Sequence, residues 1–164
     1  MKGMKEMPRL ETLQAKEDTL VSFALACGAA KAETVSIDRV VLSPVFRDIC
    51  ETNACGNYGQ CYMCPPDVGD IQALTDRVWA FSFGLLYQTI SPLEDSFDFE
   101  GMAAAGEAHV QVSQRMQEKL ASLLPGGFLH LTCGGCRLCK DCAKREGKPC
   151  VYPDRALPSL ESYG

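Results

Sequence analysis

Residues 133–153 read CGGCRLCKDCAKREGKPCVYP, and residues 50–66 read CETNACGNYGQCYMCPP. Together these two segments hold all of the ten cysteines except Cys27. Thiols at such short offsets are not explained as separate core residues, and the chemistry that uses converging thiolates is metal or iron-sulfur ligation. We therefore predict that each segment folds as a loop around a metal centre, so that the chain is a metalloprotein with two sites.

The length and the amino terminus argue against a scaffold held by disulfides. A chain of 164 residues can bury an ordinary core, whereas cystine-dense domains are usually short and exported. The first nine residues, MKGMKEMPR, carry charge but no apolar stretch, and no segment reads as a membrane span. We expect one cytoplasmic domain over residues 1–164, without membrane contact, whose cysteines stay reduced.

The second cysteine segment has the spacing of an iron-sulfur loop. Cys136-x2-Cys139-x2-Cys142-x7-Cys150 places three close thiolates and one distant thiolate around one centre, as in ferredoxins. Cys133 is set apart by two glycines and continues an apolar segment, which predicts a buried strand thiol, with ligation as the alternative. Spacing alone also leaves open a zinc ion bound by Cys133, Cys136, Cys142 and Cys150.

The first cysteine segment is less regular. Its cysteines follow the pattern Cys50-x4-Cys55-x5-Cys61-x2-Cys64, with two prolines directly after. Four thiolates would saturate a cluster and favour electron transfer, whereas three would leave one iron open to a substrate. Cys61 decides between these possibilities, and we predict that it is a ligand.

The rest of the chain predicts an α+β fold. Periodicity indicates helices over residues 10–27, 71–81 and 102–124, and strands over residues 35–42, 83–90 and 128–132. Gly28 is expected to end the first helix, Asp70 to cap the second, and Trp79 to lie in the core. We expect a small three-stranded sheet backed by about three helices, with both cysteine loops at one end. Because strands and helices alternate, a parallel α/β arrangement is the alternative.

Charge and histidine content limit the function classes. The net charge of −5 argues against a nucleic-acid binder. The second cysteine segment is nevertheless locally positive and favours an acidic partner; its cations are Arg137, Lys140, Lys144, Arg145, Lys148 and Arg155. His109 and His130 lie within a predicted helix and strand, and we interpret both as structural.

Four ordered motifs resemble one family. They are Cys55-Gly-Asn-Tyr58-Gly59-x4-Cys64-Pro65-Pro66, Gly135-Cys136-x2-Cys139-x2-Cys142-Ala143, Pro149-Cys150-x2-Pro153 and Pro158-Ser159-x-Glu161-x2-Gly164. Over residues 28–164 the chain resembles the metal-binding proteins called domain of unknown function 2284. The resemblance implies a metal, iron-sulfur in character, and a mainly prokaryotic, often anaerobic setting, with no established reaction. Members usually continue past the equivalent of Gly164.

Three functions follow from these residues. The leading hypothesis is an iron-sulfur protein with two 4Fe-4S clusters that exchanges electrons with a larger redox enzyme. An enzymatic alternative makes the 50–64 loop an open-iron cluster for reduction or Lewis-acid catalysis. A structural alternative is a zinc protein whose metals staple its loops. The ligands predicted for two clusters are Cys50, Cys55, Cys61, Cys64, Cys136, Cys139, Cys142 and Cys150.

Overall fold

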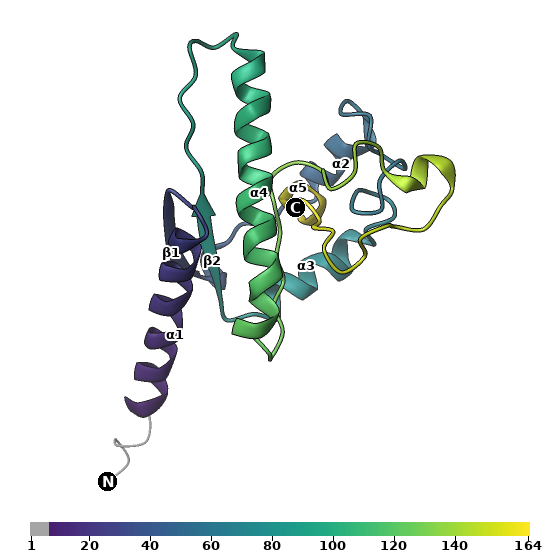
Figure 1. The fold of residues 1–164 in the computed structure, drawn as a ribbon. Helices are drawn as coiled ribbons and strands as arrows, with labels where there is room; N and C mark the ends of the chain where they lie inside the picture. Colours follow the sequence, from purple (N-terminus) through teal and green to yellow (C-terminus); the bar gives the residue numbers. More distant parts are fainter. Residues whose placement is uncertain (1–6) are drawn as a thin grey trace. The chain divides into compact units, whose positions relative to one another are not determined.

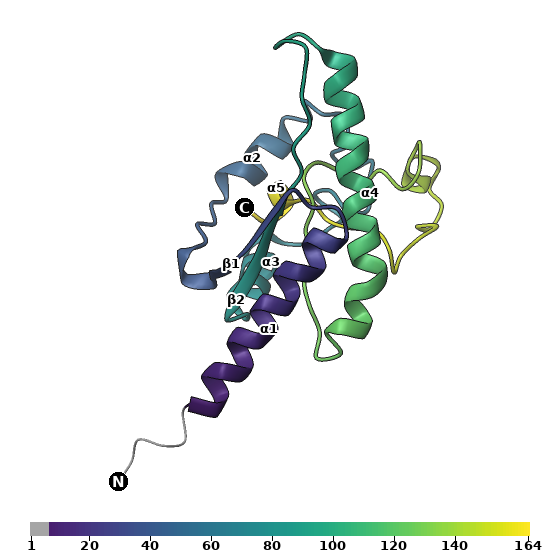
Figure 2. The same cartoon turned by 60° about the vertical axis from the view of Figure 1, so that its left-hand side comes forward.

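The chain folds into two compact units, each formed by two separate stretches of sequence. The computed structural model describes residues 7–164 (Figures 1 and 2). The first unit contains the chain up to Ser36 together with Phe83–Met116, and the second contains Ile37–Ser82 and Gln117–Gly164. All cysteines of the two cysteine-rich segments therefore belong to the second unit.

The sheet lies in the first unit and has two antiparallel strands, so the predicted three-stranded sheet is wrong. Strand β1 (Lys31–Ser36) pairs with β2 (Phe83–Gln88), with Lys31 opposite Gln88 and Ser36 opposite Phe83. The antiparallel pairing also excludes the parallel α/β alternative. Helix α1 (Met7–Ala26) runs beside these strands (Figure 2).

The segment predicted as the third strand finds its backbone partners elsewhere. Thr132 forms an isolated parallel bridge with Ser159 in the second unit. Its amide donates to the carbonyl oxygen of Pro158 at 3.0 Å, and its own carbonyl accepts from Leu160 at 2.9 Å. Since the C-terminal segment satisfies these groups, residues 128–132 do not extend the sheet.

The first predicted strand was displaced along the chain. The observed strand begins at Lys31 and ends at Ser36, and Ile37–Arg39 then form a 3-10 turn, η1. Val41, which the apolar pattern placed in the strand, is 87% exposed. Apolar character alone therefore misplaced the strand, because it did not reveal the turn that starts at Ile37.

Helix α4 (Phe99–Leu123) contributes most of its length to the first unit, where it is tied to β2. The Tyr87 and Ser113 hydroxyls lie 2.8 Å apart in a hydrogen bond, and Thr89 bonds the His109 ring at 3.0 Å. His109 therefore has the structural role that the sequence predicted. Among the residues whose burial is described, the buried hydrophobic side chains of this unit are Leu20, Ala24, Cys27, Ala29, Val112 and Met116.

Gly28 ends α1 as predicted. Its φ of +107° lies in a region that L-residues rarely adopt, and a Cβ there would lie 3.0 Å from Nη2 of Arg115. The same arginine donates from Nε to the carbonyl oxygen of Cys27 at 2.9 Å. The glycine therefore lets α4 side chains reach the end of α1.

The second unit surrounds a small core next to the cysteine loops. Besides η1 and the end of α4, its elements are α2 (Val45–Glu51), α3 (Ile71–Trp79), η2 (Ala143–Glu146) and α5 (Leu160–Tyr163). Leu74, Val78 and Tyr163 are buried together, and the half-buried residues around them are Ile37, Leu42, Val68, Leu129 and Leu131. Asp70 caps α3, as predicted, by accepting from the amides of Gln72 and Ala73 at 3.0 and 3.2 Å.

Two further findings concern apolar segments. Trp79 is 46% exposed at the end of α3, so its predicted place in the core is wrong. A single helical stripe buries Leu74 and Val78 but turns Trp79 away from it. Within residues 7–164, no helix combines the length and the apolar character needed to cross a membrane.

Candidate metal centre

The first cysteine loop begins on α2, which Arg47 holds in place. This side chain is 92% buried, with 8% of its surface exposed. Nη1 and Nη2 both donate to the carbonyl oxygen of Gly69 at 2.9 Å, and Nη2 also donates to Ser162 at 3.0 Å. One guanidinium thereby connects α2, the loop before α3 and α5, and it fixes the helix that carries Cys50.

A tight turn presents Cys61 and Cys64. The amide of Cys64 donates to the carbonyl oxygen of Cys61 at 3.1 Å, and the amide of Val68 donates to that of Cys64 at 3.0 Å. Gly59, at φ +67°, donates its amide to Pro65 at 2.8 Å and closes the loop. Both cysteines are buried, with exposures of 4% and 7%.

The second cysteine loop is held against the first by polar contacts. The Tyr62 hydroxyl donates to the carbonyl oxygen of Lys148 at 2.9 Å. Arg145 donates to the carbonyl oxygen of Gly56 at 3.1 Å and to the Asn57 side chain at 3.3 Å. Lys144 pairs with Asp67 and lies over the Tyr62 ring at 5.1 Å. These contacts bring two segments that are distant in sequence to one place.

The local positive charge of this segment is partly paired with carboxylates. Besides the Lys144 ion pair, Lys148 pairs with Glu146, and Arg155 pairs with Glu118 at 3.1 Å. Arg137 and Lys140 are exposed. Part of the positive charge that the sequence predicted to face a partner is therefore paired with carboxylates within the second unit itself.

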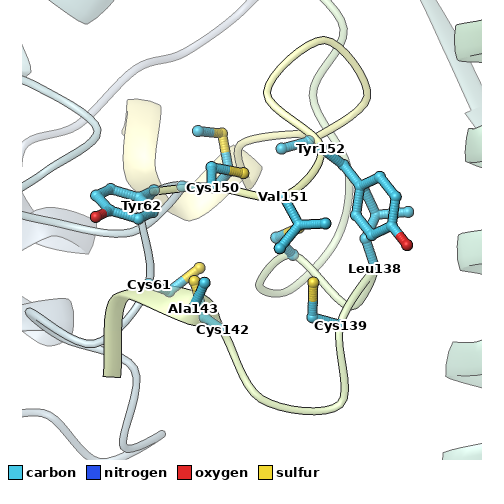
Figure 3. A pocket seen from close by; sticks show the side chains of 12 residues that line it. Cys61, Tyr62, Leu138, Cys139, Cys142, Ala143, Cys150, Val151 and Tyr152 are labelled. Carbon is cyan, nitrogen blue, oxygen red and sulfur yellow. The ribbon is translucent and has the colours of Figure 1, made fainter. Parts of the chain in front are cut away.

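Five thiols line one pocket of the second unit. They belong to Cys61, Cys136, Cys139, Cys142 and Cys150, and the rest of the wall is apolar or aromatic. Figure 3 shows Cys61 beside Cys142, with Cys139, Cys150 and the aromatic rings of Tyr62 and Tyr152 around the same space. The structure thus brings together the four ligands predicted in the second loop and adds one from the first.

Hydrogen bonds lower the pKa of the Cys61 thiol in this pocket. A hydrogen bond from Cys64 is the largest cause that lowers the pKa of Cys61 to about 6, and the Met63 backbone and Cys142 side chain add to it against burial. The pKa of Cys64 is raised correspondingly, because its thiol donates to Cys61 and is buried. The hydrogen bond between these two thiols therefore favours the thiolate form of Cys61 and the thiol form of Cys64.

The other cysteines of the first loop face a different neighbourhood. Burial raises the pKa of Cys50, and the charges of Cys55, Arg47 and Glu161 act on it as well. The charges of Cys55 and Cys50 also act on Cys64. Cys133 is exposed rather than buried; its pKa is raised by partial burial and by Glu161. The strand thiol expected at Cys133 is therefore a surface loop thiol.

The donor set fits a metal centre built on sulfur. All ten cysteines have free thiols, so no disulfide uses them. Among the residues described, no three His, Cys, Asp or Glu side chains form a group that could hold a single metal ion. The pocket thiols are instead spread around a common space, and soft thiolates are the ligands that iron-sulfur clusters and zinc select.

The pocket lined by five thiols lies within the second unit. Residues 33–164 match the family described as predicted metal-binding protein (DUF2284), and the chain belongs to that family. The match covers the whole second unit, including both cysteine loops. No curated protein and no solved structure matches the chain.

Sequence reasoning missed two residues that lie beside the cysteine loops. Arg47 anchors the first loop, and Glu161 acts electrostatically on both Cys50 and Cys133. The signal for Glu161 was its place in the C-terminal motif, while an arginine on a short helix gives no signal of its own.

His130 bonds the Gln117 side chain at 3.0 Å, which agrees with its predicted structural role.

Proposed function

We propose that this chain is an iron-sulfur protein that carries two 4Fe-4S clusters and exchanges electrons with a larger redox enzyme. The observation that carries the proposal is the pocket in which five thiols meet apolar and aromatic side chains. Such a lining supplies thiolate ligands and keeps water from the cluster, and both properties set a reduction potential. When bound, each cluster would accept one electron from a donor protein and pass it to an acceptor.

The arrangement of the thiols supports iron-sulfur clusters over the zinc alternative. A zinc site needs four donors within about 2.0–2.3 Å of one point. The thiols here surround a space without forming a group of that kind. The lowered pKa of Cys61 favours a thiolate at that position, which suits ligation of either iron or zinc.

The test is anaerobic purification followed by quantification of iron, acid-labile sulfide and zinc. Two clusters predict about eight iron and eight sulfide per chain. Electron paramagnetic resonance of the reduced protein should then show cluster signals, and a potentiometric titration should place their potentials in the range of ferredoxin-type donors. Full zinc occupancy without sulfide would replace the proposal with the structural alternative.

One observation favours a second candidate function, the open-iron enzyme. Cys61 lines the pocket of the second loop, which leaves Cys50, Cys55 and Cys64 as the first loop's remaining thiols. Three thiolates on a 4Fe-4S cluster would leave one iron for a substrate. A cluster signal that changes when small ligands such as cyanide are added would support this candidate.

A further inference from the structure

Grouping the thiols by position in space gives a different result from grouping them by position in sequence. Cys61 belongs to the first loop, yet it lines the pocket formed by the second. Its sulfur hydrogen-bonds with Cys142, and its charge acts on Cys136. Figure 3 shows the Cys61 and Cys142 side chains next to each other. The neighbours of Cys61 therefore include members of the other cysteine set.

The remaining thiols of the first loop group around a different point. Cys50, Cys55 and Cys64 act electrostatically on one another, and none of them lines the pocket of Figure 3. Cys64 connects the groups through its bond to Cys61. The three-residue step from Cys61 to Cys64 therefore passes from one group to the other.

Cys133 is placed to join the first group. Glu161 acts on both Cys133 and Cys50, so these two thiols share a neighbour on α5. Two residues after Cys133, a Cβ on Gly135 would lie 3.7 Å from the Cys64 sulfur and 3.5 Å from Asn57. The start of the second loop thus runs beside the first group, and a metal centre there would have a fourth thiolate within the same neighbourhood.

We infer that the two metal centres are interleaved: Cys61 takes one of the four ligand places in the pocket that five thiols line, and Cys133 serves the centre of Cys50, Cys55 and Cys64. The inference rests on the proposed function for the existence of two centres. It replaces the assignment by sequence, in which each loop would hold its own cluster. Each centre then takes ligands from both loops, so neither loop binds metal independently.

Double substitutions test this arrangement, whichever metal is bound. Substituting two ligands of the same centre should remove only that centre, whereas substituting one ligand of each centre should remove both. We expect Cys61→Ser with Cys142→Ser to retain half of the wild-type metal, and Cys61→Ser with Cys50→Ser to retain none. Likewise, Cys133→Ser with Cys50→Ser should retain half, and Cys133→Ser with Cys142→Ser none. Cys27→Ser, in the first unit, is the control and should keep all metal.

The reverse pattern, with half of the metal kept by the Cys50 and Cys61 double variant, would overturn the inference. So would single Cys61→Ser or Cys133→Ser variants that keep both centres, or a wild-type chain with fewer than two. Far-UV circular dichroism identifies variants that fail to fold; because Cys133 is exposed, its pairs supply the result if Cys61 variants do not fold. Zinc in place of iron with the expected pattern would reject the proposed function and keep the interleaved ligands.

Discussion

Arg47 donates a hydrogen bond of 3.0 Å to the carbonyl oxygen of Ser162, across 115 positions of sequence. This bond joins α2, which carries Cys50, to α5, which carries Glu161 near the same thiol. The side chain is buried, and its bonds to Gly69 hold the loop that leads into α3. The geometry of the first cysteine group therefore depends on a residue that binds no metal itself.

Arg47→Ala should lower the free energy of unfolding by about 1–3 kcal/mol, because it leaves the carbonyl oxygens of Gly69 and Ser162 without their donor. Chemical denaturation of the metal-free chain measures the change. Arg39→Ala, at an exposed arginine, is the matched control and should stay within about 0.5 kcal/mol of wild type. Equal effects of the two substitutions would contradict the anchoring role.

Leu74→Ala should destabilise the chain by about 2–5 kcal/mol, since it removes a side chain 4% exposed from the core formed with Val78 and Tyr163. Thermal or urea unfolding provides the measurement. Leu86→Ala makes the same chemical change on a side chain 65% exposed and should cost much less. A loss of similar size at both leucines would argue against this core.

Tyr62→Phe should weaken the attachment between the two cysteine loops. The substitution keeps the ring under Lys144 but removes the hydroxyl that donates to Lys148. We expect a stability loss of about 0.5–1.5 kcal/mol and faster release of bound metal to a chelator. Tyr58→Phe, in the same loop, is the control. Unchanged release rates in Tyr62→Phe would show that the hydroxyl does not hold the loops.

His109 should titrate below pH 6.5. Burial lowers its pKa, and its ring is stacked on Tyr87 with centroids 5.7 Å apart. Because the unfolded chain takes up this proton first, His109 reduces stability as the pH falls below 6.5 and has no such effect well above it. Nuclear magnetic resonance of the ring protons measures the midpoint, and His109→Gln should flatten the pH dependence of unfolding. A midpoint at or above 6.5 would contradict the burial.

Local signals in the sequence predicted local structure well. Gly28 and Asp70 act at helix ends as expected, because capping depends on a few neighbouring residues. The prediction of a third strand was wrong because Thr132 pairs with Ser159, and no local pattern specifies that pairing. Likewise, the cysteine spacing predicted a set of ligands, but which of these thiols share a space depends on how the loops pack. Cys61 and Cys133 were therefore the residues that spacing alone could not assign.

The ion pairs of Lys144, Lys148 and Arg155 have a consequence for encounters in solution. Each cation lies beside a carboxylate, so a molecule approaching from several ångströms away meets dipoles there rather than isolated charges. Dipole fields decay with distance faster than those of single charges. Association with an anionic protein should therefore slow less with added salt than the lysine and arginine content of residues 137–155 suggests.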